Sequence, residues 1–326
     1  MCKLLEKGQA VRALRREKAD MREFESVFAK YFSNSDEQQK AELKQNLFWF
    51  ISDVLDTTTL ENALEGVDEI YHCAAIVSFL QKDREQMMNI NVNGTANMVN
   101  IALQKGAKKF CHVSSIAALG REKSGDKITE KTKWGESKNN SNYAVSKYRS
   151  EMEVWRGIEE GLNAVIVNPG VILGAGNWNK GSCKLFKLVW KGMPFYTTGV
   201  NGYVDVKDVA RAMISLMDNN ISGERFILAG ENMEMRNYLD MVAGQFNKKK
   251  PFIEAGKFLS QIAVVADSFK SVFTGREPSL TKETARSVQN RFYYSSKKIN
   301  EKINFEFSPI NETITEICNH FLNDHK

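Results

Sequence analysis

The strongest constraint on the fold is the alternation of short β-branched runs with helical patterns over the first two-thirds of the chain. Such alternation is typical of βαβ units, in which each helix returns the chain for the next strand of a parallel sheet. Helices are predicted over 84–104 and 142–160, because Gly106 and Gly161 follow these segments as helix stops. Strands are predicted over 10–14, 48–51, 69–73, 109–114 and 163–168. The sequence therefore predicts an α/β fold with a doubly wound parallel sheet.

Two regions depart from this alternation. Residues 20–45 are charged, helix-prone and longer than an ordinary βα connection, which predicts an amphipathic helical insertion. After Gly199 come a short apolar segment at 203–209, a predicted strand at 225–228 and helical segments rich in Lys and Asn, which together predict a smaller C-terminal lobe. The insertion is predicted to turn four apolar side chains inward, namely Phe24, Val27, Phe28 and Phe32.

The composition argues against several kinds of partner. At 326 residues and 42% hydrophobic, the chain can bury a large core. Its net charge of +5 is dispersed from end to end, which leaves no basic stripe for nucleic acid. The five cysteines form no C-x-x-C pair and the four histidines have no metal-ligand spacing, so neither disulfides nor a metal site is expected. Without a membrane-length apolar run or a signal peptide, the chain is predicted to be cytoplasmic, with no membrane partner.

Tyr143 and Lys147 form a candidate proton-transfer pair. Residues four apart share one face of a helix, so a phenol and an ammonium there can act on one substrate atom. Tyr143 follows Ser115 by 28 residues, and Ser115 closes a predicted strand at its carboxyl end, where open α/β sheets bind ligands. The same spacing without this context occurs at Tyr203/Lys207, predicted within a strand, and at Tyr293/Lys297 and Tyr294/Lys298, predicted in a surface segment.

The ammonium of Lys147 is expected to lower the pKa of Tyr143. Free tyrosine titrates near pH 10, which is too high for a general base at neutral pH. An ammonium about 4 Å away, at an effective dielectric of roughly 20, contributes on the order of 4 kcal/mol, or about three pK units. The phenol is therefore predicted to titrate at about pH 7. Ser115 is the predicted partner of the phenol, because strand alternation turns Ser114 the other way.

The start of the chain lacks a feature that nucleotide-binding folds of this kind normally have. Such folds open with a strand, a Gly-rich turn and a helix whose N-terminal N–H groups hold a pyrophosphate. Here the first glycine, Gly8, stands alone after Leu4-Leu5-Glu6-Lys7 and is predicted to cap the end of a helix. The opening strand, the Gly loop and most of the first helix are therefore predicted to be absent from this chain. The absent strand would be the central one, between the second and fourth strands of the order 3-2-1-4-5-6.

Seven short stretches carry a family resemblance by their order and spacing. They are 53–56 (Asp-Val-Leu-Asp), 71–75 (Tyr-His-Cys-Ala-Ala), 91–95 (Asn-Val-Asn-Gly-Thr), 112–115 (His-Val-Ser-Ser), Tyr143 to Lys147, 168–170 (Asn-Pro-Gly) and 203–208 (Tyr-Val-Asp-Val-Lys-Asp). With them the chain resembles the extended short-chain dehydrogenase/reductase family, the broad NAD-dependent epimerase/dehydratase group that includes dihydroflavonol 4-reductases and nucleotide-sugar epimerases. The resemblance covers nearly everything after Leu4.

The resemblance implies a Rossmann-type sheet lacking its first strand, with a smaller C-terminal substrate lobe. The NAD(P)-binding domain would comprise 1–170 plus about 200–230, and the substrate-binding lobe 171–199 and 231–326. The implied catalytic residues are Ser115, which would bond the substrate oxygen, Tyr143, Lys147, which would also bind the nicotinamide ribose, and Asn91 or Asn93, which would hold a water that relays protons to the lysine.

The implied cofactor residues favour NADPH. Arg15 and Arg16 follow the second strand of the family, where an NAD enzyme usually has a carboxylate and where arginine suits a 2′-phosphate. Glu17 keeps NAD open as an alternative. The other cofactor contacts implied by the resemblance are Asp53 and Val54 around the adenine, Ala74 and Ala75 beneath the cofactor, and Pro169, Gly170 and Val171 beneath the nicotinamide.

Three functions stay open at this point. The first is an NADPH-dependent oxidoreductase acting on a carbonyl or alcohol of a small molecule, the second a nucleotide-sugar epimerase with bound NAD, and the third an inactive nucleotide-binding protein. Ile116 and Ala117 stand where a sugar dehydratase of the family has acidic residues, which argues against that activity. Leu119 stands where many epimerases have a tyrosine, which favours a reductase. Relatives often dimerise through the helices flanking the sheet, so a homodimer is a further expectation.

Overall fold

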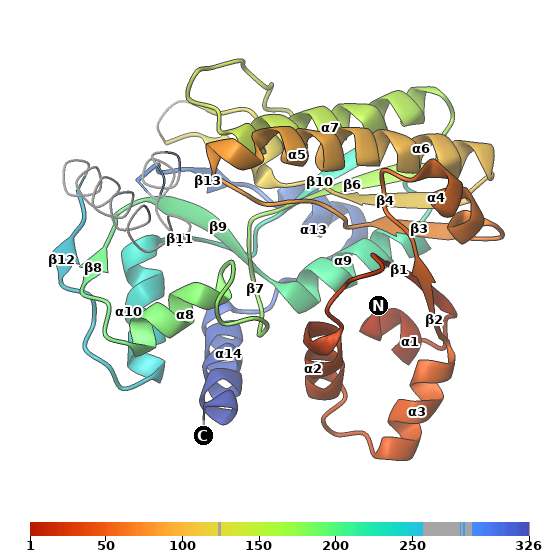
Figure 1. The fold of residues 1–326 in the computed structure, drawn as a ribbon. Coiled ribbons are helices and arrows are strands. Elements are labelled where there is room, and N and C mark those ends of the chain that lie inside the picture. The colour runs from red at the N-terminus through yellow and green to blue at the C-terminus, as the bar shows by residue number, and fades with distance from the viewer. Residues whose placement is uncertain (123–124, 257–280, 282, 284–288, 326) are drawn as a thin grey trace.

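The central parallel strands are arranged in two sheets (Figure 1). The computed structural model describes residues 1–122, 125–256, 281, 283 and 289–325. One sheet pairs β1 with β2, and the other has the order β10-β6-β4-β3, with all of these pairings parallel. The predicted strands are confirmed to within a residue or two at their ends. The strands are β1 (Val11–Arg15), β2 (Leu47–Ile51), β3 (Glu69–His72), β4 (Lys109–Val113), β6 (Ala164–Pro169) and β10 (Glu224–Leu228).

Helices cover both faces of the larger sheet, so its strands are apolar on both sides. On one face, Phe110 and Ile166 pack against α4 (Thr57–Leu64), α6 (Gly94–Gln104) and α7 (Asn142–Glu159). On the other, Cys111 and Val165 pack against α9 (Val206–Asp218) and α13 (Lys297–Ile303). Successive residues of one strand thus enter different cores, as the alternation of strand side chains requires. The predicted doubly wound α/β architecture is confirmed.

The chain begins with a short helix that ends as the sequence predicts. After α1 (Cys2–Glu6), Gly8 has φ +73°, and its N–H bonds to the Leu5 carbonyl at 2.9 Å. In the described residues β1 pairs only with β2, and β3 only with β4. This is the arrangement left when the first strand is taken out of the order 3-2-1-4-5-6. That such a strand is missing from the chain stays a prediction.

The predicted insertion consists of two helices. They are α2 (Arg22–Tyr31) and α3 (Glu37–Gln45), and α3 begins at a capping box made by Asp36 and Gln39. Phe28 and Phe32 are buried, as predicted. The prediction for Val27 is wrong, because its side chain is 38% exposed: Phe24 and Phe28, four residues apart, define the inward face, and Val27 lies to the side of it.

A second layer consists of strands and helices that follow β6 in the chain, together with β5 (Lys127–Ile128). The three-stranded sheet has the order β11-β9-β7, and Tyr203 on β9 is fully buried and stacks on Tyr238 at 5.1 Å. The prediction that Lys207 shares a strand with Tyr203 is wrong, because Asp205 caps α9 and places Lys207 in that helix. Tyr294 is also buried rather than on the surface. The elements of this layer are β7 (Val171–Leu173), α8 (Cys183–Trp190), β8 (Phe195–Tyr196), β9 (Val200–Asp205), β11 (Glu231–Glu234), α10 (Met235–Gln245), β12 (Ile253–Glu254), β5 (Lys127–Ile128), β13 (Tyr293–Tyr294) and α14 (Ile310–Asp324).

Lys109 joins the larger sheet to α9. The side chain lies at the start of β4 and is buried, and its ammonium donates to the carbonyls of Leu216, Met217 and Asn219 at the end of α9. These carbonyls have no partner within the helix, so the ammonium satisfies them and complements the helix dipole.

No helix in the described part of the chain has the length and apolarity needed to cross a membrane.

Replacing Lys109 by Met should lower the free energy of unfolding by about 2 kcal/mol, because hydrogen bonds from a charged donor are lost and the carbonyls of Leu216 and Met217 are left unpaired. The matched control is Lys108→Met, since Lys108 is a solvent-exposed neighbour paired with Asp68. Its loss should stay within about 0.5 kcal/mol. Urea unfolding of the two variants measures the difference, and equal losses would refute this role of Lys109.

Candidate active site

The carboxyl ends of the parallel strands carry most of the predicted site residues. The loops after β2, β3 and β4 begin with Ser52, Cys73 and Ser114. A chain of contacts holds these ends together. Val54 packs so closely on Gly94, at the start of α6, that a Cβ there would lie 2.6 Å from the valine methyl. One turn earlier, Asn91 binds the loop after β3.

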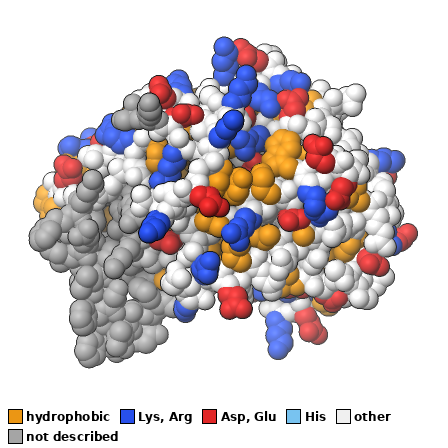
Figure 2. Space-filling model, turned by 90° about the horizontal axis from the view of Figure 1, so that it is seen from above, with side chains coloured by type: hydrophobic (Ala, Val, Ile, Leu, Met, Phe, Trp, Pro, Cys, Tyr) orange, Lys and Arg blue, Asp and Glu red, His pale blue; other side chains and the backbone are white. Residues whose placement is uncertain are grey.

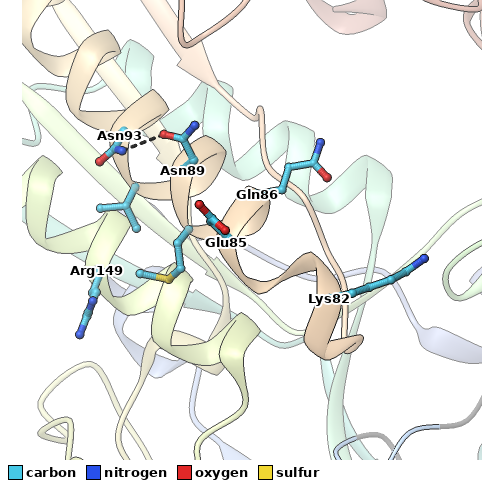
Figure 3. A pocket seen from close by; sticks show the side chains of 8 residues that line it. Lys82, Glu85, Gln86, Asn89, Asn93 and Arg149 are labelled. Atoms are coloured by element: carbon cyan, nitrogen blue, oxygen red, sulfur yellow. Dashed lines mark hydrogen bonds between the residues drawn. The ribbon is translucent and has the colours of Figure 1, made fainter.

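Asn91 anchors this loop to α7. The predicted helix 84–104 contains a π-helical turn, η2 (Asn89–Asn93), between α5 (Arg84–Met88) and α6. The buried Asn91 amide accepts from Ile76 N at 2.7 Å and donates to Ile76 O at 2.9 Å and to Ser146 Oγ at 3.0 Å. Both ends of the amide are thus engaged in holding the protein together, and the proton-relay role stays a prediction. Asn93 is exposed and bonds to Asn89 in an outer groove (Figure 3).

The side chains of Ser115 and Tyr143 lie close to each other, and the Ser115 hydroxyl acts to lower the pKa of the phenol. Ser115 follows β4 and caps the short helix η3 (Ile116–Ala118), and its Oγ accepts from Ala117 N at 3.1 Å. Tyr143 lies in the first turn of α7, which Ser141 caps by accepting from Ala144 N at 3.0 Å. Of the four tyrosines that match the spacing, Tyr143 is thus the one beside Ser115. The catalytic roles of the two residues stay predictions.

The protonation state of Tyr143 differs from the prediction. Burial raises the pKa of Tyr143, and the hydrogen bond from Ser115 offsets only part of this rise. The predicted lowering by Lys147 was wrong, because the Lys147 ammonium donates to the Val113 carbonyl at 2.8 Å instead of facing the phenol. The phenol is therefore protonated at neutral pH. The ring of Phe79 packs edge-on against Tyr143, with centroids 5.9 Å apart.

Lys147 is a buried ammonium. Its side chain is on the inner face of α7, and the residue is 2% exposed. Burial lowers the pKa of Lys147 to about 8, while Glu151 and Cys73 act in the opposite direction. Lys147 is therefore mostly charged at neutral pH and loses its proton in the mildly alkaline range.

The residues predicted to bind the adenosine part of the cofactor lie after β1 and β2. Arg15 and Arg16 lie at the carboxyl end of β1, and Arg15 Nη1 donates to Glu17 O at 3.3 Å. Asp53 Oδ1 accepts from Leu55 N at 3.0 Å, and the Val54 carbonyl accepts from Asn97 at 3.0 Å. Both contacts shape the turn between β2 and α4.

Three predicted residues beneath the nicotinamide form the passage between the two larger sheets. Pro169 ends β6, Val171 begins β7, and Gly170 lies between them with its N–H on the Leu228 carbonyl at 2.9 Å. A Cβ on Gly170 would lie 2.3 Å from the Gly202 carbonyl oxygen, so this position requires glycine for packing.

The site fits the nicotinamide end of a dinucleotide. Ala74 and Ala75 are exposed and small, and they follow Cys73, which interacts electrostatically with Lys147. Ser115, Tyr143 and Lys147 supply the polar groups. For the pyrophosphate end, residues 1–10 contain Gly8 as their single glycine, so they include no Gly-rich turn.

Sequence reasoning missed a buried polar network behind these residues. Glu151, one turn beyond Lys147 on α7, accepts from Ser114 Oγ at 2.6 Å, Asn168 Nδ2 at 2.8 Å and Arg225 Nη1 at 2.9 Å. The prediction that Ser114 turns away from the phenol is consistent with its bond to Glu151. The i, i+4 spacing from Lys147 to Glu151 was a signal in the sequence, whereas nothing in it pointed to Arg225.

Two tryptophans beyond the Ser115–Tyr143–Lys147 group pack against other parts of the protein. Trp134 stacks on Tyr148 of α7 with ring centroids 4.4 Å apart and an interplanar angle of 7°, so it holds its loop against that helix. Trp178 is buried in the second layer and donates to Asp324 Oδ2 at 2.8 Å.

Comparison with known proteins assigns the family. The sequence model of the NAD dependent epimerase/dehydratase family matches residues 3–229. The protein named "Putative dihydroflavonol 4-reductase" from Synechocystis is 26% identical over 284 residues, which cover 84% of this chain and 82% of that protein. Cinnamoyl-CoA reductase 1 of Petunia hybrida is 27% identical, with 79% of each chain covered.

Solved structures share the fold. The crystal structure of gox2253 is 29% identical and superposes with a TM-score of 0.78 over 99% of this chain and 94% of that one. UDP-glucose 4-epimerase of Thermotoga maritima, at 16% identity, has a TM-score of 0.75 over the same shares of the two chains. This chain therefore belongs to the NAD dependent epimerase/dehydratase family, whose members are NAD(P)-dependent enzymes.

Proposed function

We propose that the protein is an NADPH-dependent reductase of a small-molecule carbonyl. The observation that carries this proposal is the position of the Tyr143 phenol beside Ser115 at the end of β4, where burial raises the pKa of the phenol. A reductase must deliver a proton to the carbonyl oxygen, and a phenol that keeps its proton at neutral pH is suited to that step. The similarity to reductases over most of the chain supports the same reaction class.

Each residue has a distinct part in this reaction. Bound NADPH would supply the hydride, which adds to the carbonyl carbon. Tyr143 donates its proton to the carbonyl oxygen, and Ser115 donates a hydrogen bond to the same oxygen as negative charge develops there. The Lys147 ammonium, which donates to the Val113 carbonyl at the end of β4, would hold the nicotinamide ribose. Phe79 packs edge-on against the Tyr143 ring and so helps to hold the phenol in place.

An epimerase is the second candidate, because solved epimerases share this fold. The reductase is favoured at one position: where many epimerases of the family have a tyrosine, this chain has Leu119, whose side chain is buried in an apolar cluster. A leucine there offers no polar group to a sugar hydroxyl. The two activities are separable by stoichiometry, since a reductase consumes NADPH with each turnover and an epimerase does not.

Replacing Tyr143 by Phe should lower kcat for carbonyl reduction by about 10²- to 10⁴-fold, because the proton donor is removed. NADPH affinity, measured by fluorescence titration, should stay the same. The matched control is Tyr148→Phe on the same helix, whose ring stacks on Trp134 and should tolerate the loss of its hydroxyl. Turnover retained in Tyr143→Phe would exclude this role of the phenol.

We propose NADPH as the preferred cofactor because Arg15 and Arg16 extend from the end of β1. Changing both to Ala should reduce the preference for NADPH over NADH about tenfold or more, since charge-assisted contacts to the 2′-phosphate are lost. Lys18→Ala/Lys3→Ala removes the same charge elsewhere and serves as the control. Cofactor titrations measure the two ratios, and equal preference in both double variants would contradict the assignment.

We also propose a homodimer through the helix face seen in Figure 2, where apolar side chains gather at the centre among charged ones. A groove on this side is lined by Met88 and Val92 and by the charged Lys82, Glu85 and Arg149 (Figure 3). A two-fold axis would set this face against its own copy, with apolar residues at the centre and charges of both signs at the rim.

Val92→Glu should convert this dimer into a monomer, because the new carboxylate would be buried without a partner. Val27→Glu, on the exposed side of α2, is the control and should remain dimeric. Sedimentation velocity distinguishes the two states. A monomeric wild-type chain would refute the proposed dimer.

A further inference from the structure

Glu151 is a carboxylate without solvent contact in the middle of the molecule. It is 0% exposed. Besides its bonds to Ser114, Asn168 and Arg225, it accepts from Trp155 Nε1 at 3.3 Å. All four partners are donors, an arrangement that suits the ionised carboxylate and leaves neither oxygen unsatisfied.

The network reaches the proposed catalytic serine through one amide. Asn168 is fully buried at the end of β6, and its Nδ2 donates both to Glu151 Oε2 at 2.8 Å and to the Ser115 carbonyl at 3.0 Å. Ser114, which precedes Ser115 in the chain, donates a hydrogen bond from its hydroxyl to the same Glu151 oxygen. Glu151 therefore holds both residues at the strand end from which the Ser115 hydroxyl meets Tyr143.

The network also acts on the proposed catalytic lysine. Lys147 lies one helical turn before Glu151. From the other elements packed against it, Lys147 faces His72, Cys73 and His112. Burial lowers the pKa of His72 to about 3 and lowers that of His112 well below its ordinary value. Desolvation raises the pKa of Cys73, so all three are neutral near pH 7. Among these groups and the protonated Tyr143, Glu151 is the one that supplies a negative charge.

We infer that Glu151 is a positioning residue of the proposed reaction: its buried negative charge keeps the Lys147 ammonium protonated at neutral pH, and its hydrogen bonds through Ser114 and Asn168 fix Ser115. This inference rests on the proposed function for its catalytic consequence. The alternative is that Glu151 is only a counter-ion for Arg225, which also donates to the Glu130 carbonyl at 3.0 and 2.7 Å and so has a structural role of its own. A counter-ion role alone would leave the protonation of Lys147 unchanged when the charge is removed.

The test measures the protonation of Lys147 directly and needs no substrate. The protein is labelled with lysine carrying ¹³C at Cε, and the Lys147 resonance, assigned by its loss in Lys147→Arg, is followed against pH. In Glu151→Gln the titration should move about one pH unit lower, because a nearby opposite charge is lost. In Trp155→Phe, which removes one hydrogen bond but keeps the carboxylate, it should stay at the wild-type position.

A second variant guards against failure to fold. Glu151→Gln leaves Arg225 without its counter-charge, so Glu151→Gln/Arg225→Met removes both charges and should show the same downward displacement. If either variant folds and Lys147 titrates as in the wild type, the inference is wrong.

Activity gives the second readout. A protonated Lys147 is required, so wild-type kcat should fall as pH rises through about 8. In Glu151→Gln this fall should begin at lower pH, costing about fivefold in kcat at pH 8. An unchanged pH profile in Glu151→Gln would overturn the inference. If the wild type reduces no carbonyl compound with NADPH, the proposed function fails, while the lysine titration still decides whether Glu151 controls Lys147.

Discussion

The hydrogen bond from Lys147 Nζ to the Val113 carbonyl fixes α7 to the end of β4, and the geometry of the site depends on it. A buried ammonium is costly unless its donors are satisfied and a counter-charge is near. Here the strand-end carbonyl accepts one hydrogen bond from the ammonium, and Glu151 on the next helical turn provides the counter-charge. With the helix held in this rotation, Tyr143 necessarily faces Ser115. On its other side, Asn91 binds Ser146 and so ties α7 to the loop that follows β3.

Much of this arrangement follows from patterns that a sequence carries locally. The βαβ alternation located each central strand, and Ser115 at a predicted strand end singled out Tyr143 among the four matches to its spacing. The cap at Gly8 was also predictable, since a positive φ after a helix favours glycine. Cofactor preference and dimerisation cannot be read from local patterns in this way, because they depend on a bound cofactor and on a second copy of the chain.

The errors have a common physical origin in tertiary contacts. The ammonium of Lys147 was expected to face the phenol, but the Val113 carbonyl, 34 residues earlier, competes for it. Arg225 lies 74 residues from Glu151, so no local pattern could pair them. Val27 was assigned inward from its apolar character alone, yet the direction of α2 is set by the aromatic contact of Phe24 with Trp49 on β2. In each case the contact that forms is determined by residues that become neighbours only when the chain folds.

Burial decides how strongly Glu151 acts on its neighbour. The same helix carries a comparison at the same spacing, the pair Arg156 and Glu160, whose side chains are 37% and 48% exposed. Water and salt screen that pair, so it contributes only a few tenths of a kcal/mol. Glu151 has no exposed surface, so its field on Lys147 is not screened in this way. The burial that makes an isolated carboxylate unfavourable is therefore also what lets Glu151 oppose the desolvation of Lys147, and Arg225 is what makes that burial tolerable.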